Sequence, residues 1–245
     1  MANDAHISGS GRITGGDYNE IHISGSGKWD GPIRCRSFHV SGSCRGQGTV
    51  TVLEDLHCSG SLRNEGHLDA GEISVSGSAR VEGNVAGREA VHVSGSLQCH
   101  ALYGGEVSIS GGLKTESDVE ATSFRLTGGG EISGLLNAEE VDICIGLSIG
   151  KPIRIGQIGG SEIRVRRRET ISLLGRLFRD GKLNSPAVVV QQIEGDEIDL
   201  TGVQADVVRG TDIVIREGCE IGRTEHSGEL TVEDGAKVGE RVYVG

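Results

Sequence analysis

The sequence predicts an all-β fold, a parallel β-solenoid with a triangular cross-section and about 17 residues in each coil. Three observations support this prediction. Glycine accounts for 41 of the 245 residues, whereas the aromatic residues together supply only 3%. The tripeptide Ser-Gly-Ser, or a close relative of it, recurs along the first half of the chain. Pairs of apolar residues that flank one outward position recur with the same period.

The tripeptide sets the period of the repeat. Its central glycines follow one another at intervals of 16 to 18 residues, and they are Gly9, Gly25, Gly42, Gly60, Gly77, Gly95, Gly111 and Gly128. Alignment on these glycines produces a first apolar column of Ile21, Phe38, Leu56, Ile73, Val91, Val107, Phe124 and Val141. A second apolar column, two residues later, contains Ile23, Val40, Cys58, Val75, Val93, Ile109, Leu126 and Ile143. Each pair describes a short strand with one buried face, and stacking converts the columns into internal ladders.

The length of one repeat predicts the shape of each coil. Sixteen to eighteen residues fit three short strands joined by tight corners, and the glycine after the second apolar column permits such a corner. A narrow interior of this kind has little room for large rings, in agreement with the aromatic content.

The repeat continues beyond Val141 with one interruption. The spaced apolar pair returns at Ile163 and Val165, Ile198 and Leu200, Ile213 and Ile215, and Leu230 and Val232. The interval from Ile163 to Ile198 is 35 residues, about one coil too long. An insertion must therefore interrupt the coil that starts at Ile163. We therefore expect N-terminal coils over 1–162, an interrupted coil over 163–192 and C-terminal coils over 193–245, about thirteen coils in all.

The insertion is basic and amphipathic, and we expect it to form a helix or loop. The chain as a whole has a formal charge of −11, but residues 164–182 contain seven cations and two anions. On a helical wheel the apolar residues of this stretch occupy one half. An anionic membrane surface is therefore one expected partner. The expected membrane-binding residues are Arg166, Arg167, Arg168, Ile171, Leu173, Leu174, Arg176, Leu177, Phe178 and Arg179. Packing on the flank of the acidic solenoid is the main alternative, and nucleic acid or another partner is a further one.

Several classes of function are disfavoured by composition and motifs. The negative charge disfavours a general nucleic-acid surface. Six cysteines without a CxxC pair favour free thiols over a zinc site. The segment Gly25–Trp29 departs from the phosphate-loop pattern, so we expect no nucleotide. No secretory signal or membrane span is evident, which favours a cytoplasmic protein. We expect no catalysis, no cofactor and no catalytic metal.

Two outward columns of polar residues accompany the apolar columns. The histidines His6, His22, His39, His57 and His92 share the outward position between the two apolar columns. A metal site normally needs ligands that converge from different directions, so an exposed ladder or a pH-sensitive lateral contact strip is the favoured interpretation. The serines Ser24, Ser41, Ser59, Ser76, Ser94 and Ser110 form an outward column that favours cross-coil hydrogen bonds over nucleophilic chemistry.

One enzymatic alternative stays open at this stage. Apolar residues at Ile215, Ile221, Val232, Val238 and Val244 show steps of six, which resembles the hexapeptide repeat of the left-handed β-helix acyltransferases. That resemblance implies a catalytic histidine, for which His226 is the nearby candidate. The first 160 residues do not keep the strict hexads of that family.

The Ser-Gly coils, with turns such as Val81-Glu82-Gly83-Asn84-Val85, resemble the bactofilins, polymer-forming cytoskeletal proteins of bacteria. The stretches Ile193–Ile198, Val207–Gly210 and Glu217–Gly222 are similar to the longer, Firmicute-type members. The resemblance covers nearly the whole chain. It implies a right-handed β-helix, nucleotide-independent end-to-end polymerisation, attachment to the inner face of the cell membrane, and scaffolding in cell shape or motility.

The terminal coils are expected to carry the contact between copies of the chain. An unpaired coil leaves strand edges that act as a template for another chain. The residues expected at this contact are Ile7, Val242, Tyr243 and Val244. We take Ile7 and Val242 to lie in the buried columns of the two end coils.

Overall fold

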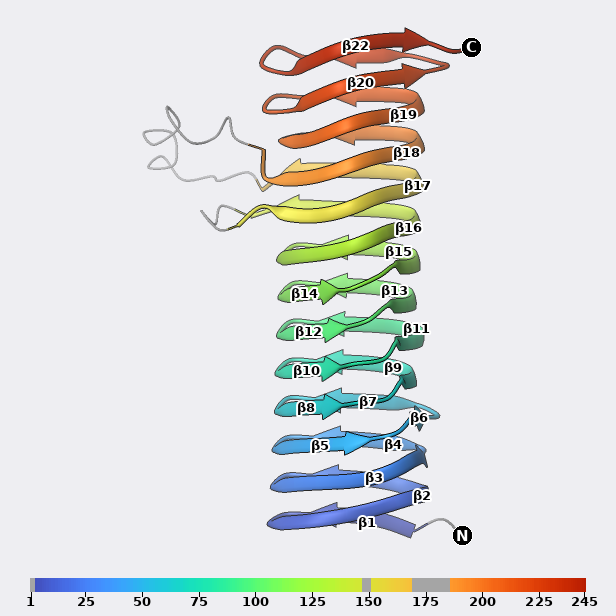
Figure 1. Cartoon of the computed structure of the whole chain (residues 1–245), viewed down its shortest axis with the longest axis vertical. Helices are drawn as coiled ribbons and strands as arrows, with labels where there is room; N and C mark the ends of the chain where they lie inside the picture. The colour runs from blue at the N-terminus through green and yellow to red at the C-terminus, as the bar shows by residue number, and fades with distance from the viewer. Residues whose placement is uncertain (1–2, 147–150, 169–185) are drawn as a thin grey trace. The chain divides into compact units, whose positions relative to one another are not determined.

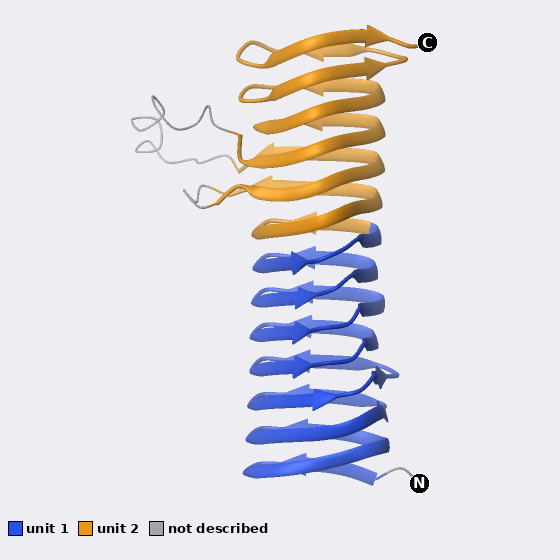
Figure 2. Ribbon diagram, in the orientation of Figure 1, with its two compact units in different colours: residues 1–122 blue, residues 123–245 orange. Residues whose placement is uncertain are grey.

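The computed structural model describes residues 3–146, 151–168 and 186–245, and these residues form parallel strands and contain no helix (Figure 1). The strands build a β-solenoid of about 13 turns with roughly 17 residues in each turn. This confirms the all-β solenoid and its period. The chain divides into two compact units, Met1–Thr122 and Ser123–Gly245, which are coloured separately in Figure 2. The division falls at a different place from the boundaries at 162 and 192 that the repeat suggested.

The first unit consists mainly of short strands. They are β1 (Asn3–Ile7), β2 (Ser10–Ile23), β3 (Ser26–Cys35), β4 (Ser37–Val40), β5 (Ser43–Gln47), β6 (Val50–Val52), β7 (Asp55–Cys58), β8 (Ser61–Asn64), β9 (Leu68–Val75), β10 (Ser78–Val81), β11 (Val85–Val93), β12 (Ser96–Cys99), β13 (Leu102–Ile109) and β14 (Gly112–Thr115). Strand β15 (Val119–Leu126) includes the division between the units.

The second unit has longer strands. They are β16 (Gly129–Ile145), β17 (Ile153–Arg167), β18 (Val188–Leu200), β19 (Val203–Ile215), β20 (Glu220–His226), β21 (Leu230–Val232) and β22 (Lys237–Tyr243).

The strand register of the first unit follows the columns that the repeat predicts. In the first column Ile21 pairs with Phe38, and Val91 pairs with both Ile73 and Val107. All of these side chains are buried. Burial of the same apolar positions in every turn is what makes the short strands stable, because no single turn can bury its own face.

The Ser-Gly-Ser corner requires glycine because successive corners stack in close contact. The backbone nitrogens of Ser76 and Gly77 both donate to the carbonyl oxygen of Cys58, and that of Ser78 donates to the carbonyl oxygen of Gly60, at distances of 2.9 to 3.1 Å. A Cβ atom at Gly77 would lie 2.0 Å from the carbonyl oxygen of Gly60. Any side chain at this position would therefore push the two corners apart.

The register of the second unit locates the insertion. Strands β17 and β18 pair side by side, with Ile163 opposite Ile198. The insertion therefore lies between the end of β17 at Arg167 and the start of β18 at Val188. The expected amphipathic segment, residues 166–179, begins inside β17, which ends at Arg167, and its residues from 169 onward lie outside the described residues. A second interruption was not predicted: Val141 pairs with Ile163, a step longer than one repeat, and the extra residues fall between β16 and β17.

Candidate functional site

The candidate functional surfaces are the outward columns and the two terminal turns, and the histidine column is the most regular of them. His22 pairs with His6 and with His39, and His39 pairs with His57. The column continues through Ser74 to His92. Every histidine in it is exposed or half-buried. The predicted histidine ladder is therefore confirmed in position and in order.

A second outward column of the first unit carries cations and was missed by sequence reasoning. It consists of Arg12, Lys28, Arg45, Arg63, Arg80, Gln98 and Lys114 in successive turns. Three of its arginines form ion pairs with the next acidic column, in the pairs Arg12–Asp30, Arg45–Glu65 and Arg63–Glu82 at 2.8 to 3.0 Å. The signal was available, because each cation stands two residues after the second serine of the corner or its replacement. Each of these ion pairs joins a cation of one turn to a carboxylate of the next turn.

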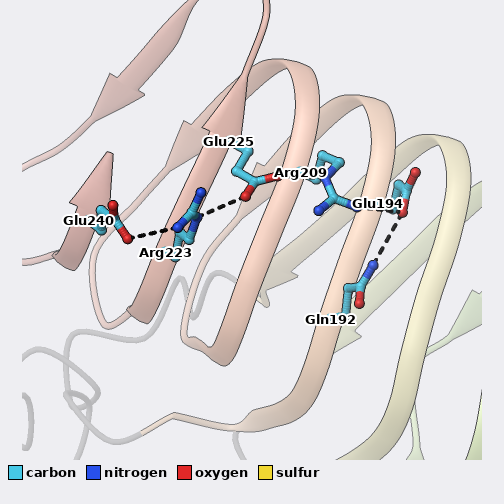
Figure 3. Close-up of polar contacts among 6 residues, drawn as sticks. All are labelled: Gln192, Glu194, Arg209, Arg223, Glu225 and Glu240. Atoms are coloured by element: carbon cyan, nitrogen blue, oxygen red, sulfur yellow. Dashed lines mark hydrogen bonds and ion pairs between the residues drawn. The ribbon is translucent and has the colours of Figure 1, made fainter. Parts of the chain in front are cut away.

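An ion-pair network crosses the turns of the second unit (Figure 3). Arg209 lies 2.7 Å from Glu225 and 3.5 Å from Glu194, while Arg223 lies 2.8 Å from Glu225 and 3.1 Å from Glu240. The hydrogen bond from Arg209 lowers the pKa of Glu225, and the same bond raises the pKa of Arg209. Glu225 is 15% exposed, but the other four side chains are 41–60% exposed, so screening by solvent limits what the network adds to stability.

The N-terminal turn of the first unit leaves apolar side chains partly uncovered. Ala5 pairs with Ile21 and Ile7 pairs with Ile23, so both continue columns that are buried in the following turn. In their own turn, Ala5 and Ile7 are only half-buried. The predicted contact residue Ile7 thus lies in an interior column, as we expected.

The C-terminal turn of the second unit is also partly uncovered. Leu230 and Val232 pair with the buried residues Ile213 and Ile215, and Val238 pairs with the buried Ile221, but all three are half-buried. Tyr243 and Val244 are 64% and 56% exposed. The Tyr243 ring packs edge-on against His226, with 5.4 Å between the ring centroids.

Val242 does not lie where sequence reasoning placed it. The register aligns Val242 with Glu225 in an outward column, whereas Arg241 aligns with the buried Thr224. In this terminal strand, however, Arg241 is exposed and Val242 is half-buried. Two buried residues of β20, Ile221 and Thr224, stand three positions apart, so the strict alternation that we assumed changes phase between them.

The first residues of the basic segment, up to Arg167, belong to strand β17 of the solenoid and not to a helix or loop as expected. The Nε and Nη2 atoms of Arg166 donate to the two carboxylate oxygens of Asp142 at 3.0 and 2.7 Å. This bond, together with the nearby Arg125, lowers the pKa of Asp142. Arg167 is half-buried, and Arg168 is exposed. The other expected membrane-binding residues, Ile171, Leu173, Leu174, Arg176, Leu177, Phe178 and Arg179, lie outside the described residues.

The structure describes the surroundings of His226, the residue that the acyltransferase alternative points to. His226, the candidate base, lies with Nδ1 2.9 Å from the carbonyl oxygen of Gly228 and with its ring against Tyr243. A shallow, open cavity of about 340 Å³ is lined by Asp17, Tyr18, Arg34, Cys35 and Leu53. It contains no histidine.

The cysteines are free thiols, and five of the six are buried. Burial raises the pKa of Cys35 and of Cys99 to about 12 and that of Cys58 to about 11, so these thiols stay protonated and weakly nucleophilic at neutral pH. Within residues 3–146, 151–168 and 186–245, no three His, Cys, Asp or Glu side chains are grouped so as to hold a metal ion. The same ranges hold no helix with the length and hydropathy of a membrane span.

Comparison with known proteins finds relatives over part of the chain. No protein-family model and no solved structure matches the sequence. The chain is similar to two proteins of Bacillus subtilis (strain 168), Uncharacterized protein YhbE and Uncharacterized protein YhbF. It is 37% identical to YhbE and 32% identical to YhbF, over 108 residues in each case. These residues are 44% of this chain, 42% of YhbE and 41% of YhbF, so the chain spans less than half the length of each relative.

Proposed function

We propose that this chain is a cytoskeletal scaffold protein of the bactofilin kind, which stacks end to end into filaments. The observation that carries the proposal is the partial exposure of interior columns in both terminal turns. Ile7 in the first unit and Val232 in the second continue columns that are otherwise buried, yet each is half-buried. Stacking the equivalent turn of another copy on these side chains would bury apolar surface and pair free strand edges.

The proposed assembly needs no nucleotide. In the segment Gly25–Lys28, the part of the chain closest to a phosphate loop, Gly25 lies in a corner and the other three residues begin strand β3. A Cβ atom at Gly25 would lie 2.0 Å from the carbonyl oxygen of Gly9, and Lys28 belongs to the outward cation column. Gly25 is thus held by stacking on the preceding corner, which supports a structural role for this segment.

The proposal includes a right-handed coil with a triangular cross-section. Parallel strands joined by a crossover within one sheet are right-handed in about 98% of cases. Support for three sides comes from turns such as the one that begins at Val85. The register of β11 shifts between Gly87 and Ala90, which separates two short segments, and β12 forms the third.

We further propose that the scaffold lies at the inner face of the cell membrane and attaches through the basic insertion. The support is the charge of residues 164–182, seven cations against two anions in a chain of net charge −11. The ion pair between Arg166 and Asp142 would fix one end of this segment on the solenoid. The remaining cations would then contact anionic lipid.

Substitutions in the terminal turns test end-to-end stacking. We expect Ile7→Asp and Val232→Asp each to shift the protein from large polymers to dimers or monomers, because a buried, unpaired charge is strongly unfavourable. Ser8→Asp and Thr231→Asp are matched controls, since these exposed neighbours point outward and should leave the polymers intact. Negative-stain micrographs and sedimentation velocity give the readout. Polymers of normal length in both apolar variants would refute end-to-end stacking and favour lateral contacts.

A further inference from the structure

The histidine column places four imidazole rings in four consecutive turns of the first unit. The ring centroids of His22 and His39 are 4.6 Å apart, whereas those of His6 and His22 are 5.6 Å apart and those of His39 and His57 are 6.5 Å apart. His22 is exposed, and 32% of the His39 side chain is accessible. The closest pair in the column is thus open to solvent.

This spacing suits two ligands of one metal ion. Neutral imidazole nitrogen is a preferred ligand of Zn²⁺, Ni²⁺ and Cu²⁺. With metal–nitrogen bonds of about 2.0–2.1 Å, two nitrogens on one tetrahedral ion lie about 3.3 Å apart. The centroids of His22 and His39 are 4.6 Å apart, and a ring nitrogen lies about 1.2 Å from its centroid, so we expect rotation of the two rings to bring one nitrogen of each to that separation. The two wider pairs would need larger movements.

A carboxylate lies beside one of the two rings. The Nε2 atom of His39 lies 3.3 Å from a carboxylate oxygen of Asp55. In protein metal sites the ligating histidine commonly donates its other N–H to a carboxylate, which fixes the tautomer and the ring orientation. When Nε2–H of His39 donates to Asp55, Nδ1 carries the free lone pair and is the nitrogen available to a metal ion.

We propose that His22 and His39 form a two-histidine surface site for a divalent transition-metal ion, with Asp55 as a positioning residue. In the described residues no group of three ligands converges, so the site has two protein ligands and leaves its other coordination positions to water. Such a site binds and exchanges its ion at the surface and performs no catalysis. The proposal does not depend on filament formation.

The histidine column provides its own controls for a calorimetric titration of the untagged full-length protein with Ni²⁺ and with Zn²⁺. We expect about one ion per chain, and at least a tenfold loss of affinity in His22→Asn and in His39→Asn. His92→Asn is the matched control: His92 occupies the same outward column, but its neighbours there are Ser74 and Ser108. Binding by this variant should equal that of the wild type.

Two further experiments test the site: one substitution that should add a second metal site, and one pair of substitutions at Asp55 that should weaken and then restore metal binding. Ser74→His would place an imidazole between His57 and His92 and should add a second bound ion. Asp55→Ala should weaken binding several-fold without changing stoichiometry or melting temperature, and Asp55→Glu should restore the affinity. Circular dichroism confirms that each variant is folded. Wild-type affinity in folded His22→Asn and His39→Asn, or an equal loss in His92→Asn, would overturn the proposal.

Discussion

Trp29 lies over Gly46 of the next turn, and a Cβ atom at Gly46 would be 1.7 Å from Cε2 of the Trp29 ring. The indole is buried and packs edge-on against Phe38, with 5.7 Å between the ring centroids. The absent side chain of Gly46 therefore provides the space that the largest ring of the interior occupies.

We expect Gly46→Ala to lower the free energy of unfolding by about 1–3 kcal/mol, because the added methyl group overpacks a filled interior. Urea unfolding followed by the fluorescence of Trp29, the one tryptophan of the chain, measures the change. Gly112→Ala is the control, since a Cβ atom there meets nothing within 4 Å. Equal stability of Gly46→Ala and Gly112→Ala would contradict this account of the interior.

We expect a Gly→Ala substitution to change the melting temperature at some corners of the solenoid and not at others. Gly77→Ala should destabilise the fold strongly, because the new Cβ atom would meet the carbonyl oxygen of Gly60 at 2.0 Å. Gly9→Ala should be nearly neutral, since a Cβ atom at Gly9 meets nothing within 4 Å. Thermal melting of the two variants tests the difference. Similar melting temperatures would show that stacked corners tolerate a side chain.

Burial of the thiols predicts a loss of stability at alkaline pH. The pKa of Cys35 and of Cys99 is about 12 in the folded protein, against 9.0 for an exposed thiol. The unfolded chain therefore loses these protons first, and the free energy of unfolding should fall as the pH rises above about 9 toward 12. Urea unfolding at pH 8 and pH 10.5 measures the slope. Because Cys99→Ala removes one such thiol, its slope should be smaller, and an unchanged slope would count against the prediction.

Thiol accessibility gives a separate prediction. Cys144 is half-buried in an outward position beside Arg166, while the other five cysteines are buried. Titration of the native protein with a thiol-reactive dye at pH 8 should modify Cys144 first and leave the others until denaturant is added. Cys144→Ser should abolish this fast phase. A fast phase that survives the substitution would mean that an interior turn opens readily.

The basic insertion predicts binding to anionic vesicles. Leu174→Glu combined with Phe178→Glu should remove the protein from the vesicle pellet, because both changes place charge on the apolar half of the helical wheel. Ser172→Glu combined with Gly175→Glu adds the same charge to the other half and should retain more binding. High salt should weaken binding by the wild type. Equal pelleting by the two double variants would favour packing of the segment on the solenoid.

The sequence by itself determined the interior ladders and the histidine column. In the first half of the chain, a repeat of 16 to 18 residues with paired apolar positions favours the register that buries both apolar columns, so His22 stands beside His39 once Ile21 stacks on Phe38. The same argument identified the corner glycines. Their φ angles are not in the left-handed region, and what requires glycine there is the close approach of stacked corners.

Tertiary structure decided the features that depend on side-chain direction and on irregular turns. The bond between Arg166 and Asp142 joins residues of different strands, and the period predicts neighbouring columns but not which cation folds onto which carboxylate. Sequence reasoning misaligned Val242 because the alternation changes phase in β20, where the polar residue Thr224 is buried. The register therefore aligns Val242 with Glu225, and it aligns the exposed Arg241 with Thr224. The repeat of apolar residues in the sequence locates the apolar side chains that must be buried. Where a polar residue such as Thr224 takes an interior position, only the hydrogen-bonded register reveals it.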